Sequence, residues 1–157
     1  MNDTALKAWL ESEGFPVTCS LQETMACRIA NATTPLMHAA RLGRVGFIGE
    51  MLSRGADPRA MNADGNGALW FACFSNCLDG VKSLIKAGAP LDSRNVNGAT
   101  ALIYAASAGK TALVKLLLEA GADTTLETLD GFTALDLAAN RTCMKQLREK
   151  PTQLQAA

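Results

Sequence analysis

A repeat of 33 residues constrains the fold of this 157-residue chain more than any other feature. Two series of glycines recur at this spacing: Gly55, Gly88 and Gly121, and Gly65, Gly98 and Gly131. A run rich in alanine and leucine recurs in the same phase, and its four copies begin at Thr34, Gly67, Thr100 and Thr133. Because a fixed period of about 20 to 50 residues is the signature of stacked structural repeats, an array of four similar units is expected.

The first half of each period predicts a short helix. Thr100 can cap this helix in the third copy, and Leu102, Ala105 and Ala106 follow at the i, i+3, i+4 spacing of one helical face. Gly109 supplies the stop. The small side chains predict close approach to neighbouring helices, which agrees with a chain that is 48% apolar but only 5% aromatic.

The second half of the period predicts a longer helix and a turn. Lys115 and Glu119 fall on the exposed side of this helix, and Gly121 ends it. Asp130 and Gly131 suit a tight turn with positive φ. The apolar stripe of the helix consists of Leu113, Val114, Leu116, Leu117 and Leu118. One such unit cannot bury both helices alone, so the units must stack.

The phased motifs resemble the ankyrin repeat, which has 33 residues, a Thr-Pro-Leu-His-x-Ala-Ala opening and a Gly-Ala-Asp close. The resemblance covers about residues 29–150 and implies an all-α solenoid of stacked helix-turn-helix units with turn-tip loops. The family's usual histidine position holds Met37, Trp70, Ile103 and Asp136 here, so the first three side chains are expected to pack instead. Asn76 replaces the glycine that ends the first helix, since asparagine also accepts left-handed backbone geometry.

The expected organisation is a helical amino-terminal cap at residues 1–28 followed by the ankyrin-repeat domain at residues 29–157. The predicted repeats cover about residues 29–61, 62–94, 95–127 and 128–157. The fourth repeat becomes polar after Ala139, as a terminal cap requires.

Two short helices are expected within residues 1–28. Asp3 could cap a helix from Thr4 to Glu13, and Ser20 with Glu23 has the form of a capping box for a helix running to Ile29. This segment is interpreted as a cap on the first repeat, which a degenerate helical pair could form, and the alternative is a separate docking segment.

The charge balance favours a protein partner. Fifteen basic and fifteen acidic residues give a formal net charge of zero, so no basic field would attract nucleic acid or an anionic membrane. No apolar run approaches the roughly 18 residues needed to cross a bilayer, and no secretory signal opens the chain. We expect a cytoplasmic protein that is a monomer on its own.

Chemistry is not expected from the cysteines or the single histidine. Cys77 and Cys143 lie two periods apart, which by register separates them too far for a shared metal or disulfide, and Cys73 replaces a packed alanine. His38 has no partner suggesting a nucleophilic site. We therefore predict no catalytic residue, no metal site and no cofactor. A metal- or redox-responsive protein that uses Cys19, Cys27, Cys73 or Cys77 is the alternative.

The resemblance implies a non-catalytic module that grips a partner protein with turn tips and the ends of the first helices, which form the concave face of ankyrin arrays. An adaptor, an enzyme inhibitor and an accessory subunit are equally compatible with this role. Phe74 and Phe132 are the leading anchor candidates, while Trp70 could either fill the missing histidine's place or join Phe74 in a patch. The predicted partner-binding residues are Arg41, Asp64, Asn66, Trp70, Phe74, Ser75, Asn97, Ser107, Asp130, Phe132 and Arg141.

Overall fold

The computed structural model describes residues 2–17 and 20–149. Within these residues the regular structure is ten α-helices and one 3₁₀-helix, with two isolated β-bridges and no strand. The chain divides into two compact parts, Met1–Ala89 and Pro90–Ala157, and each part is described by itself. No helix among the described residues is long and apolar enough to span a membrane.

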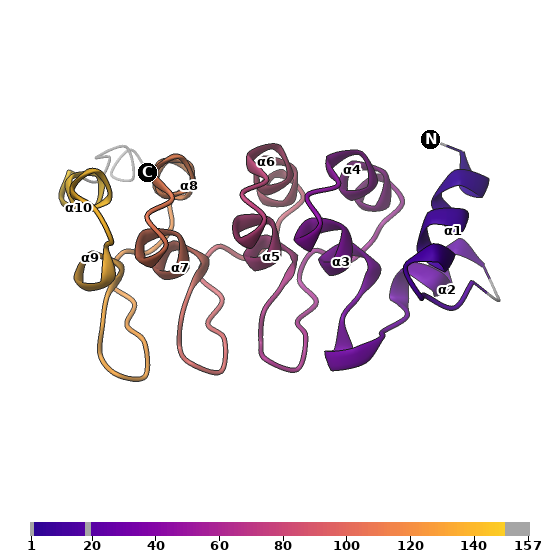
Figure 1. The fold of residues 1–157 in the computed structure, drawn as a ribbon, viewed down its shortest axis with the longest axis horizontal. Coiled ribbons are helices and arrows are strands. Elements are labelled where there is room, and N and C mark those ends of the chain that lie inside the picture. The colour runs from indigo at the N-terminus through magenta and orange to yellow at the C-terminus, as the bar shows by residue number, and fades with distance from the viewer. Residues whose placement is uncertain (1, 18–19, 150–157) are drawn as a thin grey trace. The chain divides into compact units, whose positions relative to one another are not determined.

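The amino-terminal part contains two helices that precede the first predicted repeat and the helix pairs of the first two repeats (Figure 1). Its elements are α1 (Asp3–Ser12), α2 (Leu21–Ala26), η1 (Ala30–Ala32), α3 (Pro35–Arg41), α4 (Val45–Ser53), α5 (Ala68–Phe74) and α6 (Leu78–Lys86). Helix α3 packs on α4 and α5, and α6 packs on α4 and α5. Neighbouring helix pairs therefore stack side by side, as the period predicts.

The carboxy-terminal part contains the helix pairs of the third and fourth predicted repeats. Its elements are α7 (Ala101–Ser107), α8 (Thr111–Glu119), α9 (Ala134–Leu137) and α10 (Arg141–Arg148). Helix α7 packs on α8 and α9, and α10 packs on α8 and α9. In Figure 1 the turn tips before α7 and α9 extend away from the helices.

The predicted caps and stops are present. The hydroxyls of Thr34 and Thr100 accept hydrogen bonds from the third residue of α3 and α7, which satisfies a free N–H of each helix. Gly43 and Gly109 end these helices with φ of +67° and +69°, and Asn76 takes the same role at +57°. The side chains of Met37 and Ile103 are buried, as expected for the histidine position.

The fourth repeat departs from the expected register. Helix α9 ends at Leu137 after only four residues, and Asn140 already caps α10, which begins at Arg141. The repeat period would have placed the helix stop at residue 142, but Thr142 lies inside α10. Asn140 holds the early start by accepting from Cys143 N and donating to the carbonyl of Gly109.

The two amino-terminal helices differ in detail from the prediction. Helix α1 begins at Asp3 because Asn2, not Asp3, accepts the capping hydrogen bond from Ala5 N at 2.8 Å. The capping box of Ser20 and Glu23 is confirmed, but α2 ends at Ala26, well before Ile29. The backbone turns extended at Cys27, which ends the helix.

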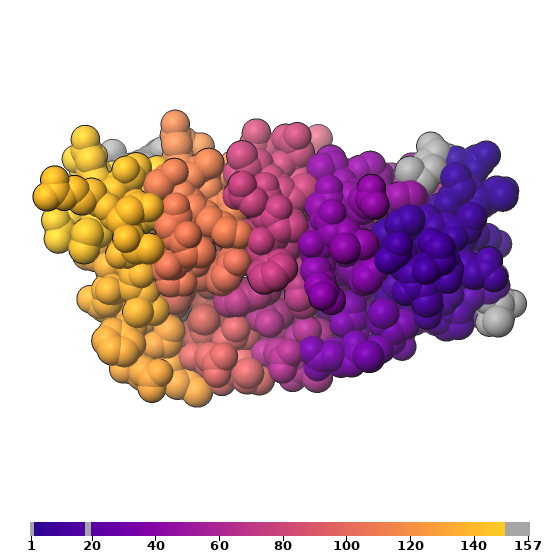
Figure 2. All heavy atoms as spheres, in the orientation of Figure 1, coloured from indigo at the N-terminus to yellow at the C-terminus, as the bar shows by residue number. Residues whose placement is uncertain are grey.

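This amino-terminal segment packs on the first repeat. Figure 2 shows its indigo atoms against the purple atoms that follow in the chain. The ring of Trp9 stacks on Phe47 of α4 with centroids 4.2 Å apart, and Arg54 at the end of α4 pairs with Asp3. Four apolar side chains among the described residues of the segment are buried: Leu6, Leu10, Phe15 and Met25. The segment therefore covers the side of the first repeat that no earlier repeat covers, and the apolar area buried there stabilises the packing.

Candidate partner-binding surfaces

Arg41 and Phe74 occupy equivalent positions at the ends of α3 and α5. Both are the last residue of their helix, and both side chains are exposed. Phe74 keeps 55% of its surface open to solvent. Aromatic side chains are enriched among the residues that contribute most to protein interfaces, so Phe74 remains the leading anchor candidate of the amino-terminal part.

Trp70 lies one helical turn before Phe74 and is only half-buried. In the equivalent positions Met37 is 1% exposed and Ile103 is 3% exposed. The larger indole ring therefore fills the vacant histidine position only in part, and its remaining surface lies on the helix face it shares with Phe74. The expectation that Trp70 packs like the other two residues is met only partly.

Other predicted residues of this part hold the structure together. Ser75 Oγ donates to the carbonyl of Ala40 at 2.7 Å and so links the second repeat to the first. Asp64 accepts a hydrogen bond of 2.7 Å from Asn31 in the preceding turn. The carbonyl of Asn66 closes its own turn by accepting from Asn62 N. Their role in binding stays a prediction.

The predicted residues of the carboxy-terminal part fall in three places. Asn97, Asp130 and Phe132 lie in the turn tips, where Phe132 is 47% exposed, and Ser107 is the exposed last residue of α7. Arg141 is exposed but opens α10, so the prediction that it lies at the end of a first helix is wrong. The shortened α9 is the reason.

Several exposed apolar side chains lie outside the predicted partner-binding set. Val96 and Leu129 lie in the turn tips and are 59% and 73% exposed, while Leu42 and Val45 flank Gly43 and are 44% and 40% exposed. Val45 looks in sequence like any apolar residue at the start of a second helix. Its exposure depends on the packing around α4, which the periodic pattern does not report.

The histidine and the cysteines have structural environments. His38 Nε2 lies 2.7 Å from Glu13 Oε2, and its ring packs near Phe15 and Trp9. Of the described cysteines, Cys73 and Cys143 are fully buried, Cys77 is 9% exposed and Cys27 is half-buried. Cys19 lies outside the described residues. Among residues 2–17 and 20–149, no three His, Cys, Asp or Glu side chains group closely enough to hold a metal ion.

Cys77 and Cys143 are not in equivalent positions, contrary to the argument from register. Cys77 precedes α6, whereas Cys143 is the third residue of α10 because that helix starts early. Burial raises the pKa of the Cys143 thiol, against a smaller opposing effect of its hydrogen bond with Asn140. A raised pKa keeps this thiol in its less reactive protonated form.

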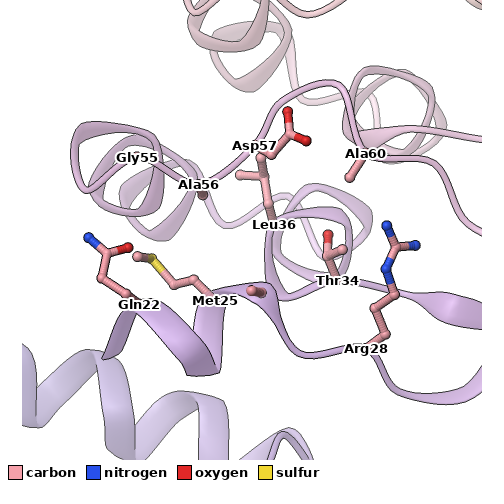
Figure 3. Close-up of a pocket in the computed structure, with 10 residues that line it drawn as sticks. Gln22, Met25, Arg28, Thr34, Leu36, Gly55, Ala56, Asp57 and Ala60 are labelled. Carbon is pink, nitrogen blue, oxygen red and sulfur yellow. The ribbon is translucent and has the colours of Figure 1, made fainter. Parts of the chain in front are cut away.

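A pocket of about 280 Å³ lies between α2, the start of α3 and the loop that follows α4 (Figure 3). Met25, Leu36 and Ala56 give it an apolar floor. Arg28 and Asp57 bring opposite charges to its lining.

Arg28 has a structural role beside this pocket. Its Nη1 donates to the carbonyls of Ala32 and Met61, which ties two successive turns together. Arg94, two periods later, donates in the same way to the carbonyls of Gly98 and Glu127. Because Arg28 serves the fold and Asp57 opposes its charge, the pocket favours no class of ligand.

The family follows from a comparison with known sequence families. A family model described as ankyrin repeats (three copies) matches residues 2–95 and again residues 69–156. The chain belongs to the ankyrin-repeat family. This ankyrin-repeat chain has the all-helical repeat architecture that its motifs imply. Ankyrin repeats are generally protein–protein interaction modules and are typically non-catalytic.

The family match differs in two details from the repeat number and the amino-terminal boundary predicted from the sequence. The model describes three copies at a time and matches in two overlapping spans, whereas the repeat period predicts four units. The first span begins at residue 2, so it includes the segment predicted as an amino-terminal cap on the first repeat. A comparison with curated proteins found no match.

Proposed function

We propose that this ankyrin-repeat chain binds a partner protein, without catalysis, through the concave-face positions of its repeats. Each compact part supplies its own contact residues. The amino-terminal part supplies Arg41, Asp64, Asn66, Trp70, Phe74 and Ser75, and the carboxy-terminal part supplies Asn97, Ser107, Asp130 and Phe132. Arg141 is retained as a neighbouring contact on α10.

The observation that carries this proposal is the exposure of Phe74 and Phe132, at 55% and 47%. Neither ring is needed at its position to fill a core, and aromatic side chains dominate the binding energy of protein interfaces. The zero net charge supports a protein partner over nucleic acid or a membrane surface.

The proposed setting is the cytoplasm, and the free chain is proposed to be a monomer whose residues 1–28 cap the first repeat. Binding would make the chain an adaptor, an inhibitor or an accessory subunit of its partner. Inhibition is the most concrete of these roles, because a rigid stack can obstruct a cleft.

Affinity capture from the source cell tests the proposal. Wild-type chain, Phe74→Ser and Phe132→Ser serve as baits, with Lys115→Ser as control because Lys115 is exposed on the outer helix α8. We expect the aromatic variants to lose a specific protein that wild type and the control retain, at unchanged melting temperature. If every bait retains the same proteins, or if none is captured, the proposed surface is wrong.

A further inference from the structure

The loop between α3 and α4 and the end of α5 together carry an exposed apolar surface. Leu42, Val45 and Phe74 are 44%, 40% and 55% exposed. Arg41 and Arg44 are exposed beside them in the chain. We call these five residues the corner patch. All of them belong to the amino-terminal part.

Packing between the first two repeats brings these segments together. Gly43 reverses the chain between α3 and α4, and a Cβ built on it would lie 3.8 Å from Ser75 Oγ and 4.0 Å from Cys77 Cβ. The loop therefore lies against the residues that directly follow Phe74. The hydrogen bond from Ser75 Oγ to Ala40 O fixes this contact.

The fold does not require this composition. In the third repeat the positions of Arg41, Leu42 and Val45 are taken by Ser107, Ala108 and Thr111. Phe74 also corresponds to Ser107, which ends α7 with the same geometry as α5. Small and polar residues occupy the equivalent positions there, so a helix pair of this fold can form without apolar side chains at these positions.

The two arginines of the corner patch are available for a partner. Within residues 2–17 and 20–149, the side chains of Arg41 and Arg44 form no ion pair or hydrogen bond. On the neighbouring helices α4 and α6, Glu50 pairs with Arg54, and Asp79 lies 4.0 Å from Lys82. The patch is thus apolar at its centre and carries two uncompensated positive charges.

We propose that the corner patch binds an acidic segment of the partner protein, in which carboxylates flank a large apolar side chain. This inference rests on the proposed function and specifies the partner's chemistry. The apolar side chain covers Phe74, Leu42 and Val45, and the carboxylates pair with the guanidinium groups, which match them in shape and charge. A basic segment would be repelled.

Selection from a random peptide library displayed on phage, with the full chain as bait, tests this proposal. We expect enriched peptides to carry Asp or Glu on both sides of Phe, Trp or Leu. A fluorescent copy of the consensus peptide then reports affinity by anisotropy. Phe74→Ser and the double variant Arg41→Glu/Arg44→Glu should each weaken its binding about tenfold or more. High salt should weaken binding to wild type more than to the double variant.

Arg59→Glu is the matched control, because Arg59 is an exposed arginine of the same part outside the patch. It should leave peptide affinity within about twofold of wild type. The proposal is overturned if no peptide is enriched, if the enriched peptides are basic or uncharged, or if charge reversal at Arg41 and Arg44 has no larger effect than Arg59→Glu. Displacement of the peptide by single-stranded RNA at equal concentration would also overturn it and point to nucleic acid.

These results separate the two proposals. If Phe74→Ser loses the captured protein but Arg41→Glu/Arg44→Glu retains it, the proposed protein binding stands. Only the proposal that the partner segment is acidic is then rejected. If capture depends on Phe132 but not on Phe74, the proposed protein binding likewise stands and the acidic-segment proposal is rejected. Capture that depends on neither ring removes the proposed function itself.

Discussion

Ala32 adopts a left-handed backbone conformation, with φ of +57°, although it is not a glycine. In the later repeats the corresponding residues are Gly65, Gly98 and Gly131, whose φ values lie between +76° and +83°. Left-handed geometry costs an alanine on the order of 1 kcal/mol because its Cβ crowds the backbone. The first turn therefore holds strain that the other turns avoid.

Replacing Ala32 with glycine should raise the free energy of unfolding by about 0.5–1 kcal/mol, measured by urea denaturation. Gly131→Ala should lower it by a similar amount, since a Cβ there meets nothing within 4 Å and only φ is strained. Gly98→Ala should cost more, because its Cβ would lie 2.9 Å from Leu129 N. A neutral or destabilising Ala32→Gly would contradict this account of the turn.

Helix α1 is tied to α3 by the contact between Glu13 and His38. The atoms Oε2 and Nε2 lie 2.7 Å apart, with the two side chains 28% and 16% exposed. The Phe15 ring packs against the same imidazole, with centroids 5.7 Å apart. The only histidine of the chain thus has a structural environment in which it orders the segment before the first repeat.

Glu13→Ala should lower the free energy of unfolding by about 1 kcal/mol, because it leaves a half-buried imidazole without its hydrogen bond. The amide protons of α1 should exchange faster than in wild type, as measured by mass spectrometry. Glu11→Ala is the control, since Glu11 is exposed on the same helix. Equal effects of the two substitutions would show that the contact with His38 contributes nothing.

Helix α9 depends on a capping box because it has only four residues. Hydrogen bonds from the backbone N–H and the hydroxyl of Thr133 lower the pKa of Asp136 below the usual value of an aspartate. A lowered folded-state pKa gives stability that is present above the ordinary pKa and is lost as pH falls through the lowered one.

Asp136→Asn should therefore reduce the pH dependence of the melting temperature between about pH 5 and pH 2. Wild type should lose stability over this range more steeply than the variant. Thr133→Ala removes the hydrogen bond from the hydroxyl to Asp136 and keeps the one from the backbone N–H. The pH dependence of its melting temperature should therefore lie between those of wild type and Asp136→Asn. Identical curves for wild type and Asp136→Asn would show that this carboxylate does not stabilise the helix.

Both compact parts of the molecule bury thiols in their helix packing. Cys73 lies in α5 of the amino-terminal part, and Cys143 lies in α10 of the carboxy-terminal part. Each is 0% exposed, so a reagent reaches it only when its part opens. This burial bears on the alternative role as a redox-responsive protein, which needs accessible thiolates.

Titration of the native chain with an aromatic disulfide reagent should leave Cys73 and Cys143 unreacted until denaturant is added. Peptide mapping after alkylation identifies which thiols have reacted, and Cys27, which is half-buried, serves as the more accessible reference. Rapid reaction of Cys73 in the folded chain would instead favour the redox alternative.

Local sequence specifies most of the helices and turns described in this chain. The capping threonines, the glycine stops and Asn76 act through the backbone of a few adjoining residues, and they produce the predicted elements. The family follows from the same signals, since their phase repeats. The early start of α10 escaped prediction, because Asn140 caps that helix while also bonding to Gly109 in the preceding repeat.

The surface is decided by neighbours that are distant in sequence. Phe74 and Trp70 lie one helical turn apart in the same helix, yet Phe74 is exposed and Trp70 is half-buried. Val45 follows an ordinary apolar pattern and is nevertheless 40% exposed. The sequence period indicates which residues can share a helix face. Solvent exposure depends on three-dimensional packing, and this packing brings the residues of the corner patch together.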